Sequence, residues 1–381
     1  MHFHQIIGQE PIKNHLRTSA QNGRIPHAQL FVGKEGSGTL PMAIAYAQFL
    51  LGLFSDNPEA SELKAAKLQH PDLHFAFPVT TTDAVKKHPI SNLFLDEWRE
   101  FITDQPYGSL FNWLQFIGVE NKQGIIGVEE ALDIVKRLQL KSYEGGFKVM
   151  IIWMAEKMNN AASNKLLKLI EEPPEKTIFL LVTENEEQLI NTIKSRCQAL
   201  HFPALSEQDI SQNLQQREQT SEGTALKIAT QAEGNYNKAL HLLHQDSNDL
   251  VFEEWVITWI RTAFKAKKNA AIIQELVVWS ETIAKTGREN QKQFLEYCLQ
   301  FFRQALLLNY KSPDLLFLEI QTLDFELQKF APFVHGENII AIEKELSDAI
   351  YHIERNGNTK IILLDLSMKL TRLLHKKETV V

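Results

Sequence analysis

The sequence predicts an α/β fold: a parallel β-sheet with helices on both faces, followed by a small helical domain and a C-terminal all-α domain. Residues 149–153 and 177–183 are short, continuous apolar runs, which are typical of strands buried on both faces. A helical pattern between them follows Asn159, a good N-cap residue, and stops at Pro173. Alternating strands and helices indicate a parallel sheet, and after Pro203 the strong patterns are all helical.

The bulk composition excludes several classes of protein. The 381 residues suffice for two or three domains, and 44% apolar with 23% charged residues is typical of globular proteins. A net charge of −7 argues against non-specific coating of nucleic acid. The N-terminus lacks a signal-peptide pattern, no apolar run approaches the roughly 18 residues that span a bilayer, and two cysteines make no disulfide framework. We expect a cytoplasmic protein without a membrane contact.

A glycine-rich loop follows an early predicted strand at residues 30–32 and precedes a helix predicted over 41–51. A phosphate-binding loop requires G-x-x-x-x-G-K-[ST], in which backbone N–H groups cradle phosphates, the lysine reaches them and the hydroxyl holds magnesium. Gly33 and Gly38 have this spacing, but Thr39 replaces the lysine and Leu40 replaces the hydroxyl residue. We expect a tight turn that binds no nucleotide; weak binding by backbone amides at the helix N-terminus remains an alternative.

The end of the predicted strand 149–153 lacks the acidic residue that a P-loop ATPase uses to hold magnesium and orient water. The positions are Trp153 and Met154, which offer no oxygen ligand to a hard cation. Glu156 follows two residues later, where we expect it to lie off the strand end. Because two independent parts of the machinery are missing, the sequence predicts no ATP hydrolysis and no bound cofactor.

The patterns divide the chain into three predicted domains. Residues 1–204 form the predicted α/β domain, 205–246 a small helical lid domain, and 247–381 a bundle of five or six helices. Residues 78–124 have a looser pattern with many aromatic side chains, which are more often a local core than a ligand platform.

Arg196 stands where a helix meets the next predicted strand. An arginine there usually caps carbonyl groups or forms a surface ion pair. Its guanidinium could instead bind phosphate oxygens on a neighbouring subunit as an arginine finger. Ser195 and Cys197 flank it as a small helix-end residue and a small apolar one, and nothing in the sequence supplies Cys197 with a catalytic base.

These motifs together resemble the AAA+ subunits of bacterial sliding-clamp loaders. The sequence NKLLKLIEEPP at 164–174, followed by SRC at 195–197, carries the resemblance most specifically. The opening IIGQE, the segment RIPHAQLFVG, His70-Pro71-Asp72 and the run GVEEALDIVKRLQLKSYEGGFKVMII fit the same family. The resemblance covers residues 1 to about 245 well and the rest only by its helical type.

The resemblance implies a three-domain subunit of a DNA polymerase III holoenzyme, with an AAA+ core, a lid and a C-terminal collar that joins five subunits in a ring. Its partners would be motor subunits of the gamma/tau type and a delta-type subunit, with the sliding clamp and primed DNA contacted indirectly. A member with a damaged nucleotide site would be a rigid scaffold, and Arg196 of its SRC motif would reach the ATP on an adjacent motor subunit.

Three departures from the family pattern stand out. Residues 52–69 contain no cysteine, so we expect no zinc module. The second sensor, usually an arginine in a G-x-x-R pattern, is Asn237 after Gly234. Residues 78–124 exceed the usual length and are a possible insertion.

Two other functions are alternatives to a scaffold that supplies Arg196 to a neighbouring subunit. One is an autonomous ATPase with an unorthodox phosphate loop, and the other is a purely structural helical adaptor whose AAA+ core is a relic. ATP turnover by the isolated chain would favour the first, and an Arg196→Ala variant without effect would favour the second.

Overall fold

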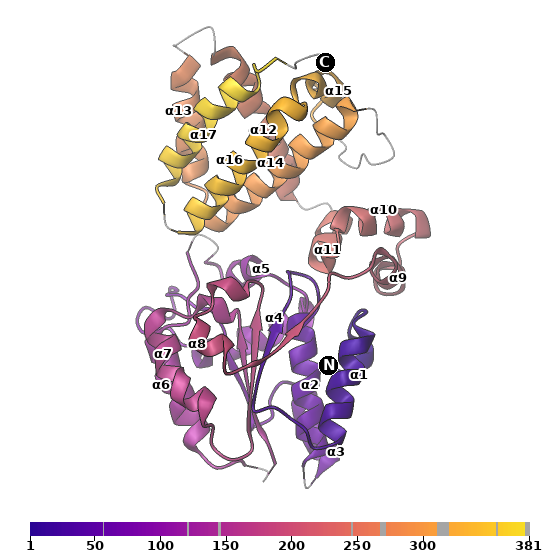
Figure 1. The fold of residues 1–381 in the computed structure, drawn as a ribbon, viewed down its shortest axis with the longest axis vertical. Coiled ribbons are helices and arrows are strands. Elements are labelled where there is room, and N and C mark those ends of the chain that lie inside the picture. Colours follow the sequence, from indigo (N-terminus) through magenta and orange to yellow (C-terminus); the bar gives the residue numbers. More distant parts are fainter. Residues whose placement is uncertain are drawn as a thin grey trace. The chain divides into compact units, whose positions relative to one another are not determined.

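The computed structural model describes residues 1–55, 57–119, 122–143, 146–244, 247–266, 272–310, 320–355 and 357–377. The chain forms two compact units, one made of Met1–Val119 and Gln123–Leu243, the other including His244–Val381. The predicted boundary between the α/β domain and the lid domain, at residues 204 and 205, therefore lies inside the first unit. The three-domain division stays a prediction. Figure 1 shows the elements of each unit.

A five-stranded parallel sheet forms the centre of the first unit, in the order β2-β3-β4-β1-β5. The strands β3 and β4 are buried along their whole length, which explains their unbroken apolar sequences. The edge strand β5 is mostly exposed. The strands are β1 (Ala28–Val32), β2 (Leu73–Ala76), β3 (Lys148–Trp153), β4 (Thr177–Thr183) and β5 (Gln198–His201).

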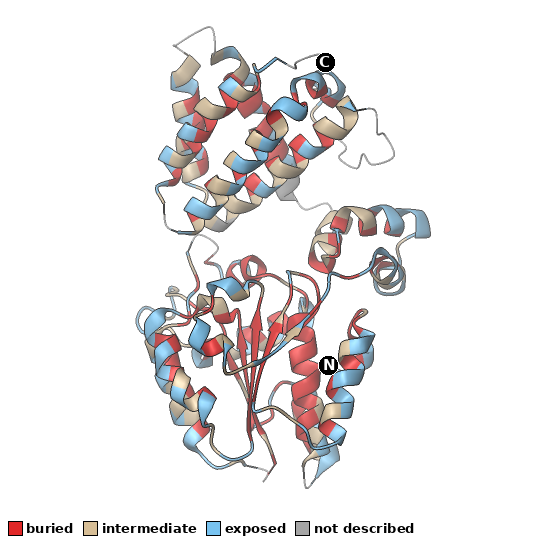
Figure 2. Cartoon of the chain, viewed as in Figure 1, coloured by how far each residue is buried: buried red, intermediate tan, exposed pale blue. Residues whose placement is uncertain are grey.

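Helices cover both faces of this sheet (Figure 1). One face packs with α1, α2 and α4, and the other with α6, α7 and the short α8. Figure 2 shows α2 and the central strands β3 and β4 as mostly buried. The helices are α1 (Glu10–Gln21), α2 (Thr39–Leu53), α3 (Pro58–Ala66), α4 (Leu95–Asp104), α5 (Leu110–Phe116), α6 (Val128–Gln139), α7 (Asn160–Glu171) and α8 (Asn191–Lys194).

The predicted insertion, apart from residues 120 and 121, which lie outside the described residues, packs through a buried aromatic cluster. Trp98 of α4 stacks on Phe77 with ring centroids 4.1 Å apart. Its ring also meets Trp113 of α5 and Trp153 at the end of β3, both at 5.1 Å. The indole N–H of Trp113 donates to the carbonyl of Pro78 at 2.8 Å. These aromatic side chains are a local core, as the sequence predicts.

Three helices make the small helical domain: α9 (Glu207–Glu218), α10 (Glu222–Ala232) and α11 (Tyr236–His244). Ser206 and Ser221 cap the first two by accepting backbone N–H groups three residues on. Their apolar sides enclose a core that also takes in Ile7 and Tyr107 from the α/β domain. The small helical domain is therefore packed onto the α/β domain of the same unit through shared buried residues.

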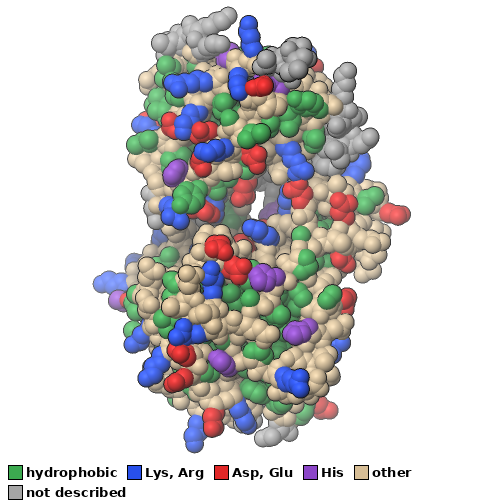
Figure 3. Space-filling model, in the orientation of Figure 1, with side chains coloured by type: hydrophobic (Ala, Val, Ile, Leu, Met, Phe, Trp, Pro, Cys, Tyr) green, Lys and Arg blue, Asp and Glu red, His purple; other side chains and the backbone are tan. Residues whose placement is uncertain are grey.

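The second unit is a helical bundle around one apolar core. Among its described residues, five helices have 12 or more residues, as predicted. They are α12 (Ser247–Ala266), α13 (Ile273–Ala284), α14 (Arg288–Asn309), α16 (Gly336–Glu354) and α17 (Thr359–Leu373), with the short α15 (Leu327–Phe330) between α14 and α16. No helix in the described part of the chain is long and apolar enough to cross a membrane. On the face in Figure 3, cationic and anionic side chains are interspersed.

One predicted boundary is wrong. The helix expected over residues 41–51 begins at Thr39 and continues through Gly52 to Leu53. Gly38, with φ +93°, provides the N-cap, so the helix starts directly behind the glycine. Gly52 lies inside the last turn because no side chain or left-handed residue stops the helix there.

Candidate functional site

The glycine loop 33–38 lies between β1 and α2, where a phosphate-binding loop would lie. Its interior is filled by its own residues. The Ser37 hydroxyl donates to the carbonyl of Lys34 at 2.6 Å, and a Cβ at Gly33 would meet Ser37 Oγ at 2.6 Å. The side-chain amide of Gln9 donates to the Ser37 carbonyl at 3.1 Å and to the Pro203 carbonyl at 2.8 Å, which ties the loop to both ends of the domain.

The loop tip is in direct contact with the small helical domain. The backbone N–H of Tyr236 donates to the carbonyl of Gly36 at 3.2 Å. Gly36 has φ +70°, and a Cβ there would collide with the side chain of Asn235, so only glycine fits. The Asn237 amide donates to Glu35 Oε1 at 2.8 Å. A carboxylate of the chain itself thus occupies the N-terminal end of α11, where backbone N–H groups favour an anion.

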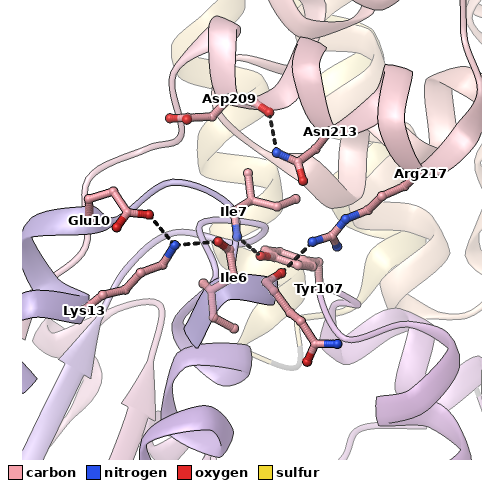
Figure 4. Close-up of polar contacts among 9 residues, drawn as sticks. Ile6, Ile7, Glu10, Lys13, Tyr107, Asp209, Asn213 and Arg217 are labelled. Atoms are coloured by element: carbon pink, nitrogen blue, oxygen red, sulfur yellow. Dashed lines mark hydrogen bonds and ion pairs between the residues drawn. The ribbon is translucent and has the colours of Figure 1, made fainter. Parts of the chain in front are cut away.

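The segment 78–124 adds a second contact near the loop through Tyr107, whose hydrogen bond to Ile7 is drawn in Figure 4. The Tyr107 hydroxyl accepts the backbone N–H of Ile7 at 2.8 Å, and its ring lies 5.1 Å from that of Tyr236. A Cβ at Gly38 would lie 3.3 Å from Cε1 of Tyr107. Burial raises the pKa of Tyr107 well above its ordinary value, so the hydroxyl keeps its proton. Arg217 donates to the carbonyl of Gln5 and so joins α9 to the N-terminal segment (Figure 4).

The position of the missing acid is filled by hydrophobic contacts. Trp153 and Met154 are 3% and 4% exposed, and both belong to the core on the α2 side of the sheet. Glu156 lies in the short 3-10 turn after β3, and its carboxylate accepts the backbone N–H of Glu184, just beyond β4, at 3.0 Å. Burial raises the pKa of Glu156. Within the described residues, no group of three His, Cys, Asp or Glu side chains could hold a metal.

Arg196 lies at the other end of the α/β domain, after α8. Its Nε and Nη2 donate to one oxygen of Glu171 at 3.0 and 2.9 Å, and its Nη1 donates to the carbonyl of Thr192 at 3.0 Å. The Arg196 side chain is 30% exposed to solvent, and the Glu171 side chain is 54% exposed. Cys197 beside it is half-buried, and burial raises the pKa of its thiol to about 11, which leaves it an inert thiol at neutral pH.

The structure thus places the predicted site residues at three points. Gly33, Gly38, Thr39, Leu40 and Asn237 gather around the loop, Trp153 and Met154 lie at the end of β3, and Arg196 and its neighbours lie after α8. Reasoning from the sequence missed four residues that make specific contacts: Glu35, Tyr107, Asn112 and Glu171. Glu171 is the first residue of the EEPP motif, and this position could have marked it as a candidate. The other three have partners that are distant in sequence, so no local pattern indicates them.

The sheet order, the glycine loop between β1 and α2, and the helical domain seated on that loop define a protein of the AAA+ P-loop type. The family model described as "DNA polymerase III, delta subunit" matches residues 8–206. The chain therefore belongs to this clamp-loader family.

Curated relatives agree with this membership. The chain is similar to the DNA polymerase III subunit delta' of Bacillus subtilis, 30% identical over 52% of this chain and 49% of that protein. It is 33% identical to the Escherichia coli subunit delta' over 34% of this chain and 38% of that protein. The tau/gamma subunit of Haemophilus influenzae is 26% identical over 64% of this chain, and the chain spans only 30% of that relative's length.

Among solved structures, the chain is similar to the Thermotoga maritima RuvB Holliday junction branch migration motor. That comparison covers 84% of this chain and 86% of the other, with 16% identity and a TM-score of 0.39.

Proposed function

We propose that this chain is a non-hydrolysing, delta-prime-type subunit of a DNA polymerase III clamp loader. In this role it is a rigid scaffold and offers Arg196 to the ATP of a neighbouring motor subunit while the sliding clamp is loaded onto primed DNA. Its direct partners would be motor subunits of the gamma/tau type and a delta-type subunit. Family membership and the similarity to delta' and tau/gamma subunits support this assignment.

The observation that carries the proposal is the state of the Arg196 guanidinium. A guanidinium has five N–H donors in a fixed fork. Three N–H groups are used by Glu171 and Thr192, so two have no partner among the residues that the structure describes, on a side chain that is 30% exposed. Two neighbouring N–H groups match the spacing of phosphate oxygens, and the charge is permanent. Arg196 is thus held in place and still able to bind a phosphate.

The glycine loop of the same chain favours a role in trans over one in cis. Glu35 places a carboxylate at the N-terminal end of α11, where an anionic ligand would otherwise be favoured. The carboxylate would repel such a ligand because like charges repel. Trp153 and Met154 offer no oxygen to magnesium. A chain with these features can contribute a cation to another site but lacks the groups that would complete its own.

The hold on Arg196 is weak enough to be reorganised. Glu171 is more than half exposed, and exposed ion pairs contribute about 0–1 kcal/mol because water screens them. A triphosphate with its higher charge density competes readily for the same guanidinium. The ion pair therefore orients the side chain without trapping it.

The test is reconstitution with the motor and delta-type subunits of the same organism, followed by ATPase measurement with sliding clamp and primed DNA. We expect Arg196→Ala to slow hydrolysis at the one motor site that it faces by about 10³-fold. Lys194→Ala is the matched control, since it removes a nearby surface cation whose contact to Glu187 is a long 3.9 Å. Assembly is checked by size-exclusion chromatography.

Two results would contradict the proposal. If Arg196→Ala and Lys194→Ala assemble and hydrolyse ATP alike, the chain is a structural adaptor. If the purified chain alone turns over ATP with magnesium above background, it is an autonomous ATPase.

A further inference from the structure

We propose that the segment Tyr107–Asn112 of the insertion is a latch that holds the small helical domain closed on the glycine loop without any ligand. The segment runs from the connection after α4 into the first turn of α5 and touches three separate parts of the first unit: the N-terminal segment, the loop and α11. This role is independent of what Arg196 does in a neighbouring subunit.

The first half of the latch is Tyr107. Its hydroxyl is the acceptor for the buried N–H of Ile7, and its ring packs edge-on against Tyr236 of α11. Both Ile7 and Tyr107 are counted in the apolar core of the small helical domain, at 1% and 5% exposure. Opening that domain would break the ring contact with Tyr236 and would expose the hydrogen bond, which joins two groups of the α/β domain, to water.

The second half is Asn112, which is 5% exposed at the first turn of α5. Its Oδ1 accepts the amide of Asn237 at 2.9 Å, and its Nδ2 lies 3.3 Å from Nε2 of His241. A capping box with Ser109 fixes the Asn112 side chain, so it is oriented before the small domain docks. Asn237 also donates to Glu35, so one amide on α11 joins the latch and the loop.

The anchor of the latch is rigid. The flanking helices α4 and α5 bury Trp98 and Trp113 completely, and both rings pack on Phe77 beside the sheet. A latch carried on such a core can hold a domain whose own three helices are near the lower size limit for independent stability.

The test is hydrogen–deuterium exchange of the full chain, read on peptides from α9 to α11. We expect Tyr107→Phe, which leaves the Ile7 N–H without its acceptor in the closed state, to raise exchange there by about tenfold to a hundredfold. Asn237→Ala, a change on the other side of the contact, should do the same. Tyr143→Phe makes the identical substitution on an exposed side chain whose backbone N–H donates to Asp72, ahead of β2, and should leave exchange unchanged.

Three results would overturn the latch. The first is exchange in α9–α11 that is the same in Tyr107→Phe, Asn237→Ala and the Tyr143→Phe control. The second is an equal rise in peptides from β3 and β4, which would mean general destabilisation. The third is strong protection of α9–α11 in the unmodified chain on adding ATP and magnesium, which would show that closure needs a ligand. None of these measurements requires another subunit, so they are separate from the test of Arg196.

Discussion

Replacing Glu130 by glutamine tests how the insertion is attached to the sheet domain. Glu130 of α6 is 1% exposed; its carboxylate accepts the backbone N–H of Ser91 at 2.5 Å and meets Arg137 at 3.3 Å. Burial is the largest influence and raises the pKa of Glu130 to about 7, although the Ser91 hydrogen bond and Arg137 act in the opposite direction. Ser91 opens the short 3-10 helix before α4, so this contact fixes the segment 78–124 to α6 directly ahead of α4.

The sign of the pH effect follows from proton binding. Between pH 4.5 and about 7 the unfolded chain has lost the Glu130 proton while the folded chain keeps it, so folding stability falls as the pH rises through this window. At about 1.4 kcal/mol per pH unit the contribution is about 3 kcal/mol, present in full below pH 4.5 and lost above pH 7. Burial lowers the pKa of His74 to about 4, and its contribution has the opposite sign, so a single pH profile is not informative.

The assay is therefore a comparison of urea unfolding curves from pH 4.5 to 8. We expect the free energy of unfolding of the unmodified chain to fall by about 3 kcal/mol relative to Glu130→Gln, because glutamine can still accept the Ser91 N–H and does not titrate. His74 is present in both proteins and cancels. Glu129→Gln, an exposed neighbour on the same helix, should follow the unmodified chain. Parallel profiles for Glu130→Gln and the unmodified chain would refute the reasoning.

Two further predictions concern the loop and the arginine. Glu171→Ala should lower the ATPase of the reconstituted loader by no more than about fivefold, far less than Arg196→Ala, because an exposed pair contributes about 0–1 kcal/mol to orientation; an equal loss would mean that Glu171 is indispensable. The double variant Thr39→Lys, Leu40→Ser restores the phosphate-loop letters, and phosphate release should stay at background because Gly36 remains in contact with the small helical domain; turnover would contradict a closed loop.

The sequence predicts the elements whose local chemistry is unambiguous. Strand β4 spans Thr177–Thr183 as its apolar run predicts. Helix α7 begins behind Asn159, whose side chain accepts the N–H of Ala162 at 2.8 Å, and ends before Pro173. Caps, breakers and buried apolar runs act over a few residues, so the pattern itself contains the information.

The contacts of the site are not local in this sense. Tyr107 and Ile7 are 100 residues apart, and Asn237 and Asn112 are 125 apart. No periodicity or cap relates such pairs, because they meet only after the sheet, the insertion and the small helical domain have packed. The sequence shows that 78–124 is aromatic and long; only the fold shows that its tip reaches the loop.

Trp153, at the position where a P-loop ATPase would have an acid, packs against the aromatic segment 78–124. Trp153 occupies the end of β3, and its ring lies 5.1 Å from Trp98 and 6.3 Å from Phe101, both on α4. An acidic side chain at this position would be buried among aromatic rings with no partner for its charge, which costs several kcal/mol. Trp153 therefore supports α4, the helix before the proposed latch, through a side chain that offers no oxygen to a metal. An acidic residue at this position would weaken that support.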